Sequence, residues 1–245
     1  MKVIVVIPAA GLGTRMSSAH AGLKSKSKQF FELQGTPILV HTLRKFDECD
    51  QVSEIVVALR ANETEGFQSM IAREVFHKPI RVVEGGEHRQ DSVANALRSL
   101  DAAPDDIVLV HDAVRPFVDH ETISGVIDAV KKYDAAIAGM PAIDTVKQVE
   151  RTADGAVVVA TIPREKMVMA QTPQGFRFAV LQKAFDEATA DGFLGTDEAS
   201  LIERGGGTVH VVMGTPRNIK ITTPGDLELA EFYLSLEEPH RLVTG

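Results

Sequence analysis

The architecture of this 245-residue chain follows from the run VIVVI at residues 3–7 and the stretch PAAGLGTRM at residues 8–16. A continuous run of β-branched residues is typical of a strand that is buried on both faces, as in a parallel sheet. Small residues directly after such a strand let backbone N–H groups approach phosphate oxygens, and Arg15 adds a bidentate donor. We therefore predict a parallel sheet whose first loop binds phosphate, although the glycines alone are also compatible with an ordinary turn.

Strand-like runs and amphipathic stretches alternate along most of the remaining chain. Further strands are expected at 55–59, 80–83, 107–110 and 135–139. Helices are expected at 37–46 with Thr36 as the cap, at 62–76 with Asn62 and Glu65 as a capping box, and at 91–100 and 120–133. This alternation predicts an α/β fold with a doubly wound, mostly parallel sheet.

The alternation of strands and helices ends after Met140. Two β-rich runs at 144–149 and 156–162 flank Asp154-Gly155, which is a strong hairpin signal. Such a hairpin is expected to project as an arm spanning 141–172. Either a partner subunit docks on it or it folds back onto its own domain. Helices at 178–190, 196–204 and 224–236 and strands at 209–212 and 219–222 complete the prediction of one domain, 1–245, with an arm.

Charge is distributed unevenly along the chain. The net charge of −8 argues against a nucleic-acid partner, which would require a basic surface. Residues 1–31 nevertheless contain five basic and no acidic side chains, so the remaining 214 residues carry 21 basic and 34 acidic groups, a net charge of −13. This local positive field favours a site for a small anion, while a solvated lysine-rich loop is the alternative.

Several classes of location and chemistry have no support in the sequence. No apolar run approaches the roughly 18 residues of a membrane-spanning helix, and no signal or transit segment is expected before the first strand. A single cysteine, Cys49, permits no internal disulfide, which is typical of the cytoplasm. Met16 stands where the dinucleotide fingerprint needs glycine, and no P-loop, catalytic-triad, His-Glu-x-x-His or cysteine-cluster pattern occurs.

Two further loops are expected at the same edge of the sheet as the first. Gly85-Gly86 follows the third strand and precedes a helix whose N-terminus suits an anion or a base carbonyl. Asp112 follows the fourth strand, where a carboxylate beside a phosphate loop suits Mg²⁺. Asp112 could instead act as a local capping residue or pair with Arg115.

Together these stretches resemble the nucleotidyltransferases that join a nucleoside triphosphate to a sugar or polyol phosphate. The set is most similar to the cytidylyltransferase family of the non-mevalonate isoprenoid pathway, and the resemblance runs from residue 3 to about 234. Besides residues 8–16, it is carried by Lys28-Gln29-Phe30, Gly85-Gly86, Arg89, Asp91-Ser92-Val93, HDAVRP at 111–116, Asp144-Thr145, QTPQ at 171–174, TDEAS at 196–200 and Asn218-Ile219-Lys220.

The resemblance implies a nucleotidyltransferase fold and transfer of CMP from CTP to 2-C-methyl-D-erythritol 4-phosphate, with Mg²⁺ and release of pyrophosphate. Arg15 and Lys28 would stabilise charge at the α-phosphate. The remaining nucleotide contacts would come from Pro8, Ala9, Ala10, Gly11 and Gly13 for the triphosphate, from Gly85, Gly86 and Ser92 for the cytosine, and from Asp112, Ala113 and Arg115 for the ribose and metal side.

The resemblance also implies the acceptor site and the assembly. Thr145 and Arg164 on the arm, with Thr172 and Lys220, would hold the acceptor phosphate. In the family the arms of two subunits interlock, so we expect a homodimer in which Arg164 reaches the partner's site. Because an acceptor phosphate is already an anionic nucleophile, the reaction needs positioning and cations rather than a protein base.

The chain departs from the family pattern at Ser27, which stands where the family usually has proline, so Lys24 or Lys26 could replace Lys28 at the phosphate. Three alternatives stay open. Ribitol 5-phosphate cytidylyltransferases share much of this sequence but tend to have glycine where Ala10 stands. A non-catalytic nucleotide sensor would be suggested by loss of Arg15, Lys28 or Asp112, all present here, and a sugar 1-phosphate nucleotidylyltransferase usually has a longer chain without this arm.

Overall fold

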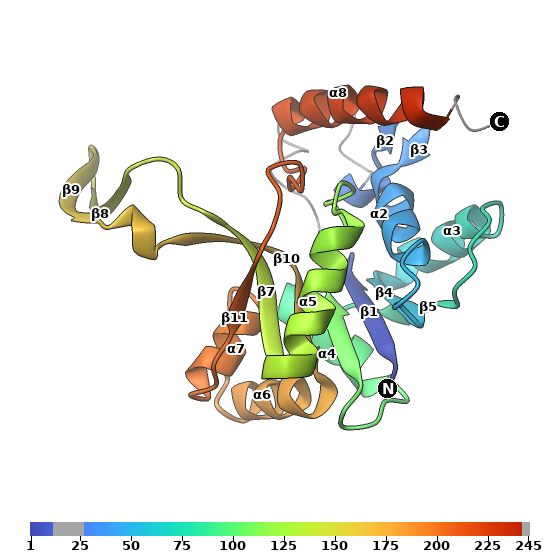
Figure 1. Cartoon of the computed structure of the whole chain (residues 1–245), viewed down its shortest axis with the longest axis horizontal. Coiled ribbons are helices and arrows are strands. Elements are labelled where there is room, and N and C mark those ends of the chain that lie inside the picture. Colours follow the sequence, from blue (N-terminus) through green and yellow to red (C-terminus); the bar gives the residue numbers. More distant parts are fainter. Residues whose placement is uncertain (12–26, 242–245) are drawn as a thin grey trace.

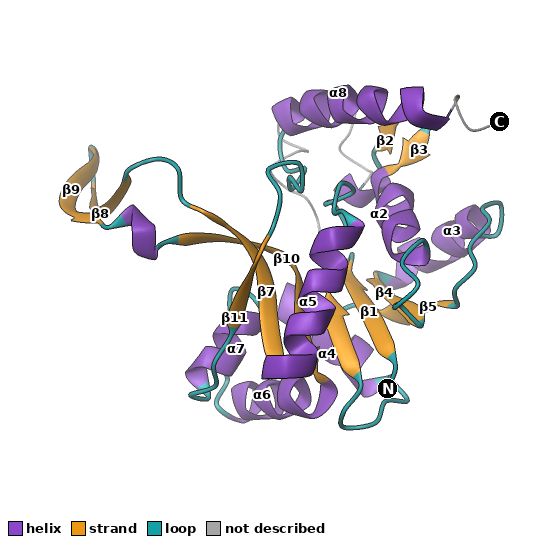
Figure 2. Ribbon diagram, viewed as in Figure 1, coloured by secondary structure: helices purple, strands orange, loops and turns teal. Residues whose placement is uncertain are grey.

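A central seven-stranded sheet organises the chain (Figures 1 and 2). The computed structural model describes residues 1–11 and 27–241, with side chains placed as far as residue 237. The strand order is β11-β7-β10-β6-β1-β4-β5. The strands are β1 (Val3–Pro8), β4 (Glu54–Leu59), β5 (Ile80–Glu84), β6 (Ile107–Val110), β7 (Ala135–Pro141), β10 (Val168–Arg177) and β11 (His210–Met213).

The strand directions confirm the predicted doubly wound, mostly parallel sheet. β1 is parallel to β4 and to β6, with Val5 opposite Ile55 on one side and Leu109 on the other. The chain runs from β1 to β4 and β5 and then returns to β6 on the other side of β1. Strand order therefore reverses beside β1, and the loops after β1, β5 and β6 meet at one edge of the sheet, where α/β proteins bind ligands.

Helices cover both faces of this sheet, as Figure 2 shows. The side chains of Val5 and Ile7 pack in a core with α2 (Ile38–Asp47), α3 (Ala61–Ile71) and α5 (His120–Tyr133). Ile4 and Val6 point to the other face, which is covered by α4 (Arg89–Arg98), α6 (Phe178–Ala190) and α7 (Glu198–Arg204). Alternate residues of β1 thus enter different cores, which explains its uninterrupted apolar sequence.

A third, smaller core connects segments that are far apart in the chain. Phe31, Val114 and Ile221 pack in it beneath α8 (Pro224–Arg241), beside the two-stranded sheet of β2 (Glu32–Leu33) and β3 (Thr36–Pro37). Figure 1 shows α8 lying across this end of the molecule. The core therefore fixes the residues that follow Lys28, Asp112 and Lys220 relative to one another.

The predicted hairpin is present and extends away from the body (Figure 1). It consists of β8 (Val146–Thr152) and β9 (Gly155–Ile162), paired antiparallel around Asp154-Gly155. Its base continues the main sheet, because Val168 of β10 pairs with Pro141 of β7. In the part of the chain that the structure describes, no helix is both long and apolar enough to span a bilayer.

One strand was missed, and three local predictions were wrong. β10 was not expected, and it runs antiparallel between β6 and β7. Residues 219–222 form no strand: they are an irregular segment, in which the Ile221 N–H donates to Val114 O (2.9 Å). Thr36 does not cap α2 but lies in β3, and Pro37 precedes the helix. Asn62 lies inside α3, which begins at Ala61 and ends at Ile71 without a side-chain cap.

Candidate active site

Two adjoining cavities lie at the carboxyl edge of the sheet. The first, here called the loop pocket, has a volume of about 170 Å³ and is lined by the loops after β1, β5 and β6 and by Lys28. The second, the β10 pocket, has a volume of about 220 Å³ and is lined by residues 170–172, Gln174, Arg115, Thr196 and Asp197. Arg89, Asp112 and Lys220 line both cavities and form the wall between them.

The first loop is held by side chains from neighbouring segments. The Ala9 N–H donates to Ala58 O (2.8 Å), and Arg60 Nε donates to Ala10 O (2.8 Å). The buried Gln29 amide donates to Ala9 O. Because Gln29 is anchored in this way, the adjacent Lys28 lines the loop pocket.

The loop after β5 approaches the first loop closely. A Cβ on Gly85 would lie 2.5 Å from the Ala10 Cβ, so a larger residue could not be accommodated without displacing that loop. The Gly86 N–H donates to Ser92 Oγ (3.1 Å), and this hydroxyl donates in turn to His88 O (3.1 Å). Ser92 is buried and thereby fixes the bend of the loop at the start of α4.

Asp112 is a buried carboxylate surrounded by three cations. Its Oδ2 lies 2.9 Å from Lys220 Nζ and 3.3 Å from Arg115 Nε, and its Oδ1 lies 3.3 Å from Arg89 Nε. Burial alone would raise the pKa of Asp112, but Arg89, Lys220 and Arg115 outweigh burial and lower it far below its usual value. Asp112 therefore stays ionised at neutral pH.

Arg89 is held from its other side by Glu198. Arg89 Nη1 lies 2.7 Å and 2.9 Å from the two carboxylate oxygens of Glu198, which is buried. Burial would lower the pKa of Arg89, but Glu198 and Asp112 raise it above its ordinary value. The guanidinium is thus fixed and charged between the two pockets.

Lys220 reaches the site from the irregular segment that precedes α8. The amide of the fully buried Asn218 donates to Thr172 O (2.8 Å), and Arg115 Nη1 donates to Asn218 O (2.7 Å). These contacts bind the segment to β10 and to the loop after β6. Lys220 is consequently placed against Asp112 even though its side chain is 37% exposed.

The hydroxyl of Thr172 takes part in a directed chain of hydrogen bonds. His111 Nε2 faces Arg115 O (3.1 Å), so this nitrogen must carry the hydrogen. Burial lowers the pKa of His111 to about 4, so the ring is neutral and Nδ1 accepts from Thr172 Oγ1 (3.1 Å). Thr172 Oγ1 accepts in turn from the Asp112 N–H (3.1 Å). Thr172 therefore fixes the backbone at Asp112.

The structure brings most of the expected site residues together. Those that line at least one pocket are Pro8, Ala9, Ala10, Gly11, Lys28, Gly86, Ser92, Asp112, Ala113, Arg115, Thr172 and Lys220. Gly85, Thr145 and Arg164 line neither. Arg164 Nη1 donates to Ile143 O (2.8 Å) near the base of the arm. Gly13, Arg15, Lys24 and Lys26 lie outside the described residues.

Sequence reasoning assigned no role to three residues that help to build the pockets. Arg89 forms part of the shared wall, Glu198 holds Arg89, and Thr196 lines the β10 pocket. All three belong to stretches that carry the family resemblance, and two are charged residues next to a helix start. Their charge beside a helix start was the signal by which sequence reasoning could have found them. The pairing of Arg89 with Glu198 could not be predicted, because it joins residues 109 positions apart.

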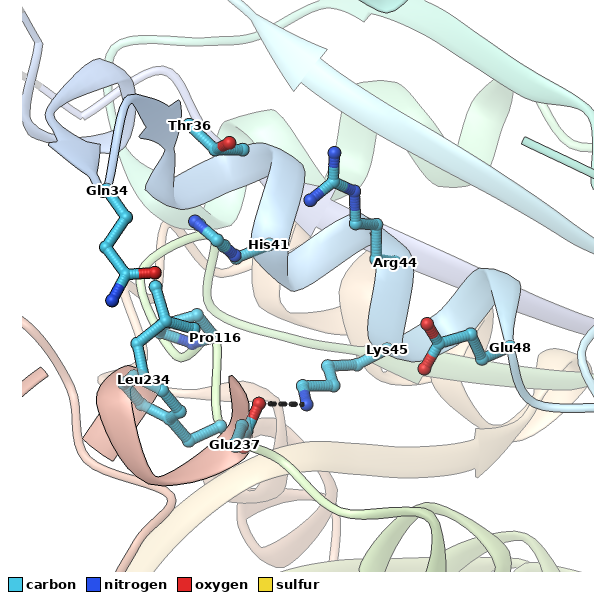
Figure 3. A pocket seen from close by; sticks show the side chains of 10 residues that line it. Gln34, Thr36, His41, Arg44, Lys45, Glu48, Pro116, Leu234 and Glu237 are labelled. Carbon is cyan, nitrogen blue, oxygen red and sulfur yellow. Dashed lines mark hydrogen bonds and ion pairs between the residues drawn. The ribbon is translucent and has the colours of Figure 1, made fainter. Parts of the chain in front are cut away.

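A further cavity of about 250 Å³ lies between α2 and α8 and includes Pro116 in its lining (Figure 3). Its basic side chains are already neutralised. Lys45 pairs with Glu237 (3.2 Å), as drawn in Figure 3, and Arg44 pairs with Glu74 (2.5 Å). This cavity therefore lacks the excess positive charge that favours a phosphate group.

Among the described residues, no group of three or more His, Cys, Asp or Glu side chains is arranged to hold a metal ion. Asp112 is the carboxylate that lines both pockets. One carboxylate fits Mg²⁺ where substrate phosphates and water supply the remaining oxygens. The donor set therefore suits a cation that arrives with a polyphosphate rather than one held by protein ligands alone.

A doubly wound sheet with two adjoining cationic pockets at its carboxyl edge can bind a nucleoside triphosphate beside a second phosphate group, as a nucleotidyltransferase requires. The model of one protein family, described as 2-C-methyl-D-erythritol 4-phosphate cytidylyltransferase, matches residues 3–236. The chain belongs to this family.

Named relatives and solved structures agree with this assignment. The chain is 57% identical over 234 residues to the 2-C-methyl-D-erythritol 4-phosphate cytidylyltransferase of Acidobacterium capsulatum, covering 96% of this chain and 98% of the relative. It is 53% identical to that of Solibacter usitatus, covering 97% of each. The crystal structure of the Francisella tularensis enzyme aligns with a TM-score of 0.78 at 37% identity, covering 95% and 99%. That of the Thermus thermophilus enzyme aligns with a TM-score of 0.74 at 33% identity, covering 95% and 98%.

Proposed function

We propose that this chain transfers CMP from CTP to 2-C-methyl-D-erythritol 4-phosphate, giving 4-diphosphocytidyl-2-C-methyl-D-erythritol and pyrophosphate, in isoprenoid precursor biosynthesis. The observation that carries the proposal is the family match over residues 3–236, which includes both pockets and their shared wall. Neither a ribitol 5-phosphate cytidylyltransferase nor a non-catalytic sensor is favoured by the comparisons.

The two pockets suggest how the substrates are divided. The loop pocket is assigned to CTP, with the backbone of residues 9–11 at the triphosphate, Gly86 and Ser92 at the cytosine, and Asp112 and Ala113 at the ribose. Gly85, also expected at the cytosine, lines neither pocket and packs against Ala10. The β10 pocket takes the acceptor phosphate beside Thr172 and Lys220. Arg115 was expected at the ribose and metal side of the nucleotide, but it lines the β10 pocket and not the loop pocket, so we assign it to the acceptor instead. The supporting geometry is that Lys220 and Asp112 line both cavities, so the two phosphates would meet at this wall.

The reaction requires an oxygen of the acceptor phosphate to attack the α-phosphorus of CTP in line with the leaving group. A new P–O bond forms, the bond between the α-phosphorus and the bridging oxygen breaks, and pyrophosphate leaves with that electron pair. The nucleophile is already anionic, so the chain need not remove a proton. Lys28 and Arg15 stabilise the charge that builds up at the α-phosphate, and Lys220 orients the acceptor.

We also propose that Mg²⁺ accompanies CTP, with Asp112 as the protein carboxylate that faces it. When bound, the ion neutralises phosphate charge. The support is the position of Asp112 in the wall of the loop pocket and the lowered pKa that keeps it ionised.

The arm is proposed to form a homodimer. Val157, Val158 and Val159 are exposed along β9, a run of apolar side chains that is typical of a surface covered by a partner. Arg164 and Thr145 lie with the arm, away from the pockets of their own chain, and are proposed to reach the acceptor in the partner's β10 pocket. A cytoplasmic location is proposed from the charged, diffusible substrates.

The proposal is tested by measuring pyrophosphate release with each nucleoside triphosphate in turn and methylerythritol 4-phosphate as acceptor. CTP with Mg²⁺ should support turnover, and EDTA should abolish it. Turnover that is equal with ATP or UTP, or that persists in EDTA, would contradict the assignment of the nucleotide or of the metal.

A further inference from the structure

The first turn of α4 binds the segment 193–198 through side-chain hydrogen bonds, and this segment contributes to the wall of the β10 pocket. The Gln90 side chain accepts from the Gly195 N–H (2.8 Å) and donates to Phe193 O (3.0 Å). The neighbouring Arg89 donates to both carboxylate oxygens of Glu198 (2.7 and 2.9 Å). Two consecutive residues of α4 thus hold both ends of this segment.

β10 holds the same segment from the opposite side. The buried Gln174 side chain donates to Asp197 Oδ2 (2.8 Å) and accepts from the Ala199 N–H (3.1 Å). The segment is also closely packed, because a Cβ on Gly195 would lie 2.6 Å from Ser200 Oγ and 2.7 Å from Leu201 Cδ2. Its backbone therefore has little room to shift while these contacts persist.

Thr196 lies between these anchored residues and lines the β10 pocket, whereas Gln90 and Glu198 line neither pocket. We propose that Gln90 and Glu198 are positioning residues that fix Thr196 in the β10 pocket and so set the affinity for the acceptor without touching it. This proposal rests on the proposed function, in which the β10 pocket receives the acceptor phosphate.

Glu198 has an electrostatic part in this arrangement as well. Arg89 is shared between Glu198 and Asp112, and Asp112 also pairs with Lys220. Removing the charge of Glu198 leaves Arg89 with Asp112 as its remaining carboxylate partner among these contacts. Arg89 then competes more strongly with Lys220 for Asp112, so both the position of Thr196 and that of Lys220 change.

Two variants and two matched controls test the proposal in the full-length chain. Gln90→Met removes both hydrogen bonds at nearly constant size, and Gln68→Met makes the same change at an exposed position of α3. Glu198→Gln removes the buried charge, and Glu203→Gln does so at an exposed position of the same helix. Each is measured for the KM of both substrates, kcat, thermal unfolding and amide hydrogen exchange without substrates.

We expect Gln90→Met to raise the KM for methylerythritol 4-phosphate about tenfold, because two hydrogen bonds of the segment are lost, and to leave the KM for CTP within about twofold. Exchange at residues 193–197 should accelerate while β1 and β6 stay protected. Glu198→Gln should raise the acceptor KM by at least as much, and both controls should match the wild type. If Glu198→Gln fails to fold, the Gln90→Met variant, which changes a half-exposed residue, decides whether the segment is held in this way.

An unchanged acceptor KM despite faster exchange would overturn the proposal, as would unchanged exchange in Gln90→Met. Equal rises in the KM of both substrates would show a general structural defect and would also overturn it. If the wild-type chain turned over no acceptor, the proposed function would fail, while exchange at residues 193–197 would still decide whether Gln90 holds the segment.

Discussion

Lys220 Nζ lies 2.9 Å from Asp112 Oδ2, so a cation from the segment before α8 meets the carboxylate at the end of β6. The contact forms part of the wall between the loop pocket and the β10 pocket. Arg89 and Arg115 share the same carboxylate, and Glu198 balances Arg89. Burial raises the pKa of Glu198, and the paired Arg89 opposes this shift. With both carboxylates ionised, the five groups carry a net charge of +1, which favours a phosphate on either side of the wall.

Asp112→Asn should destabilise the fold by about 3 kcal/mol, because three cations would then face one another around a neutral side chain. Urea unfolding measures this change. Asp128→Asn is the control, since that exposed carboxylate pairs with Lys131 at the surface and its loss should cost about 0.5 kcal/mol or less. Equal losses in the two variants would contradict a buried, cation-bound Asp112.

Lys28→Ala and Arg15→Ala should each lower kcat about a hundredfold while changing CTP binding much less, because their cations act on charge that develops in the transition state. Steady-state turnover and CTP titration separate the two effects. Lys183→Ala, at an exposed lysine of α6, is the control. Losses of equal size in turnover and in CTP binding would sink the transition-state assignment.

Lys220→Ala should raise the KM for the acceptor about tenfold with a smaller effect on CTP, because this side chain is proposed to hold the acceptor phosphate. An unchanged acceptor KM would count against that role. Arg164→Ala should have the same effect, but through the partner's site.

Mixing two variant subunits tests whether Arg164 acts in the site of the partner subunit. In a mixed dimer of Arg164→Ala and Lys28→Ala subunits, the pocket with intact Lys28 receives an intact Arg164 of the partner subunit. Random mixing should therefore restore about a quarter of the wild-type sites. No recovery on mixing, with dimers confirmed by light scattering, would show that Arg164 acts in its own chain.

His111 should make the free energy of unfolding depend on pH. Burial lowers its pKa to about 4 in the folded chain, below the ordinary value of 6.5. The unfolded chain therefore binds more protons between pH 6.5 and 4, and stability falls as the pH decreases through this window, by about 3 kcal/mol.

Urea unfolding of His111→Gln across this range should show a shallower loss than the wild type. His41, whose pKa burial also lowers, keeps part of the slope in both proteins. His120→Gln, at an exposed histidine, is the control. A slope in His111→Gln as steep as in the wild type would rule out a neutral His111 in the folded chain.

The sequence predicted those elements whose signals are local. α5 was expected at 120–133, where the Asp119 side chain accepts from the Thr122 N–H (2.7 Å) and Asp134 ends the helix with a φ of 66°. β10 was missed because its buried polar residues, Thr172 and Gln174, find partners far away in sequence, at His111 and Asp197. A polar run containing a proline therefore does not read as a central strand.

The location of the site was predictable for a related reason. Loops after parallel strands meet at one edge, so the positions of Ala9, Gly86 and Asp112 follow from the strand order. The contacts by which Gln90 and Arg89 hold the segment 193–198 could not be predicted in this way, because they join residues more than 100 positions apart.

The most direct test of the central claim is a competition between acceptors. Purified protein is given CTP and Mg²⁺ with equal concentrations of methylerythritol 4-phosphate and ribitol 5-phosphate, and the products are identified by mass spectrometry alongside pyrophosphate release. We expect 4-diphosphocytidyl-2-C-methyl-D-erythritol as the dominant product, with one pyrophosphate per product molecule. Dominant CDP-ribitol, or no cytidylated product from either acceptor, would contradict the proposed function.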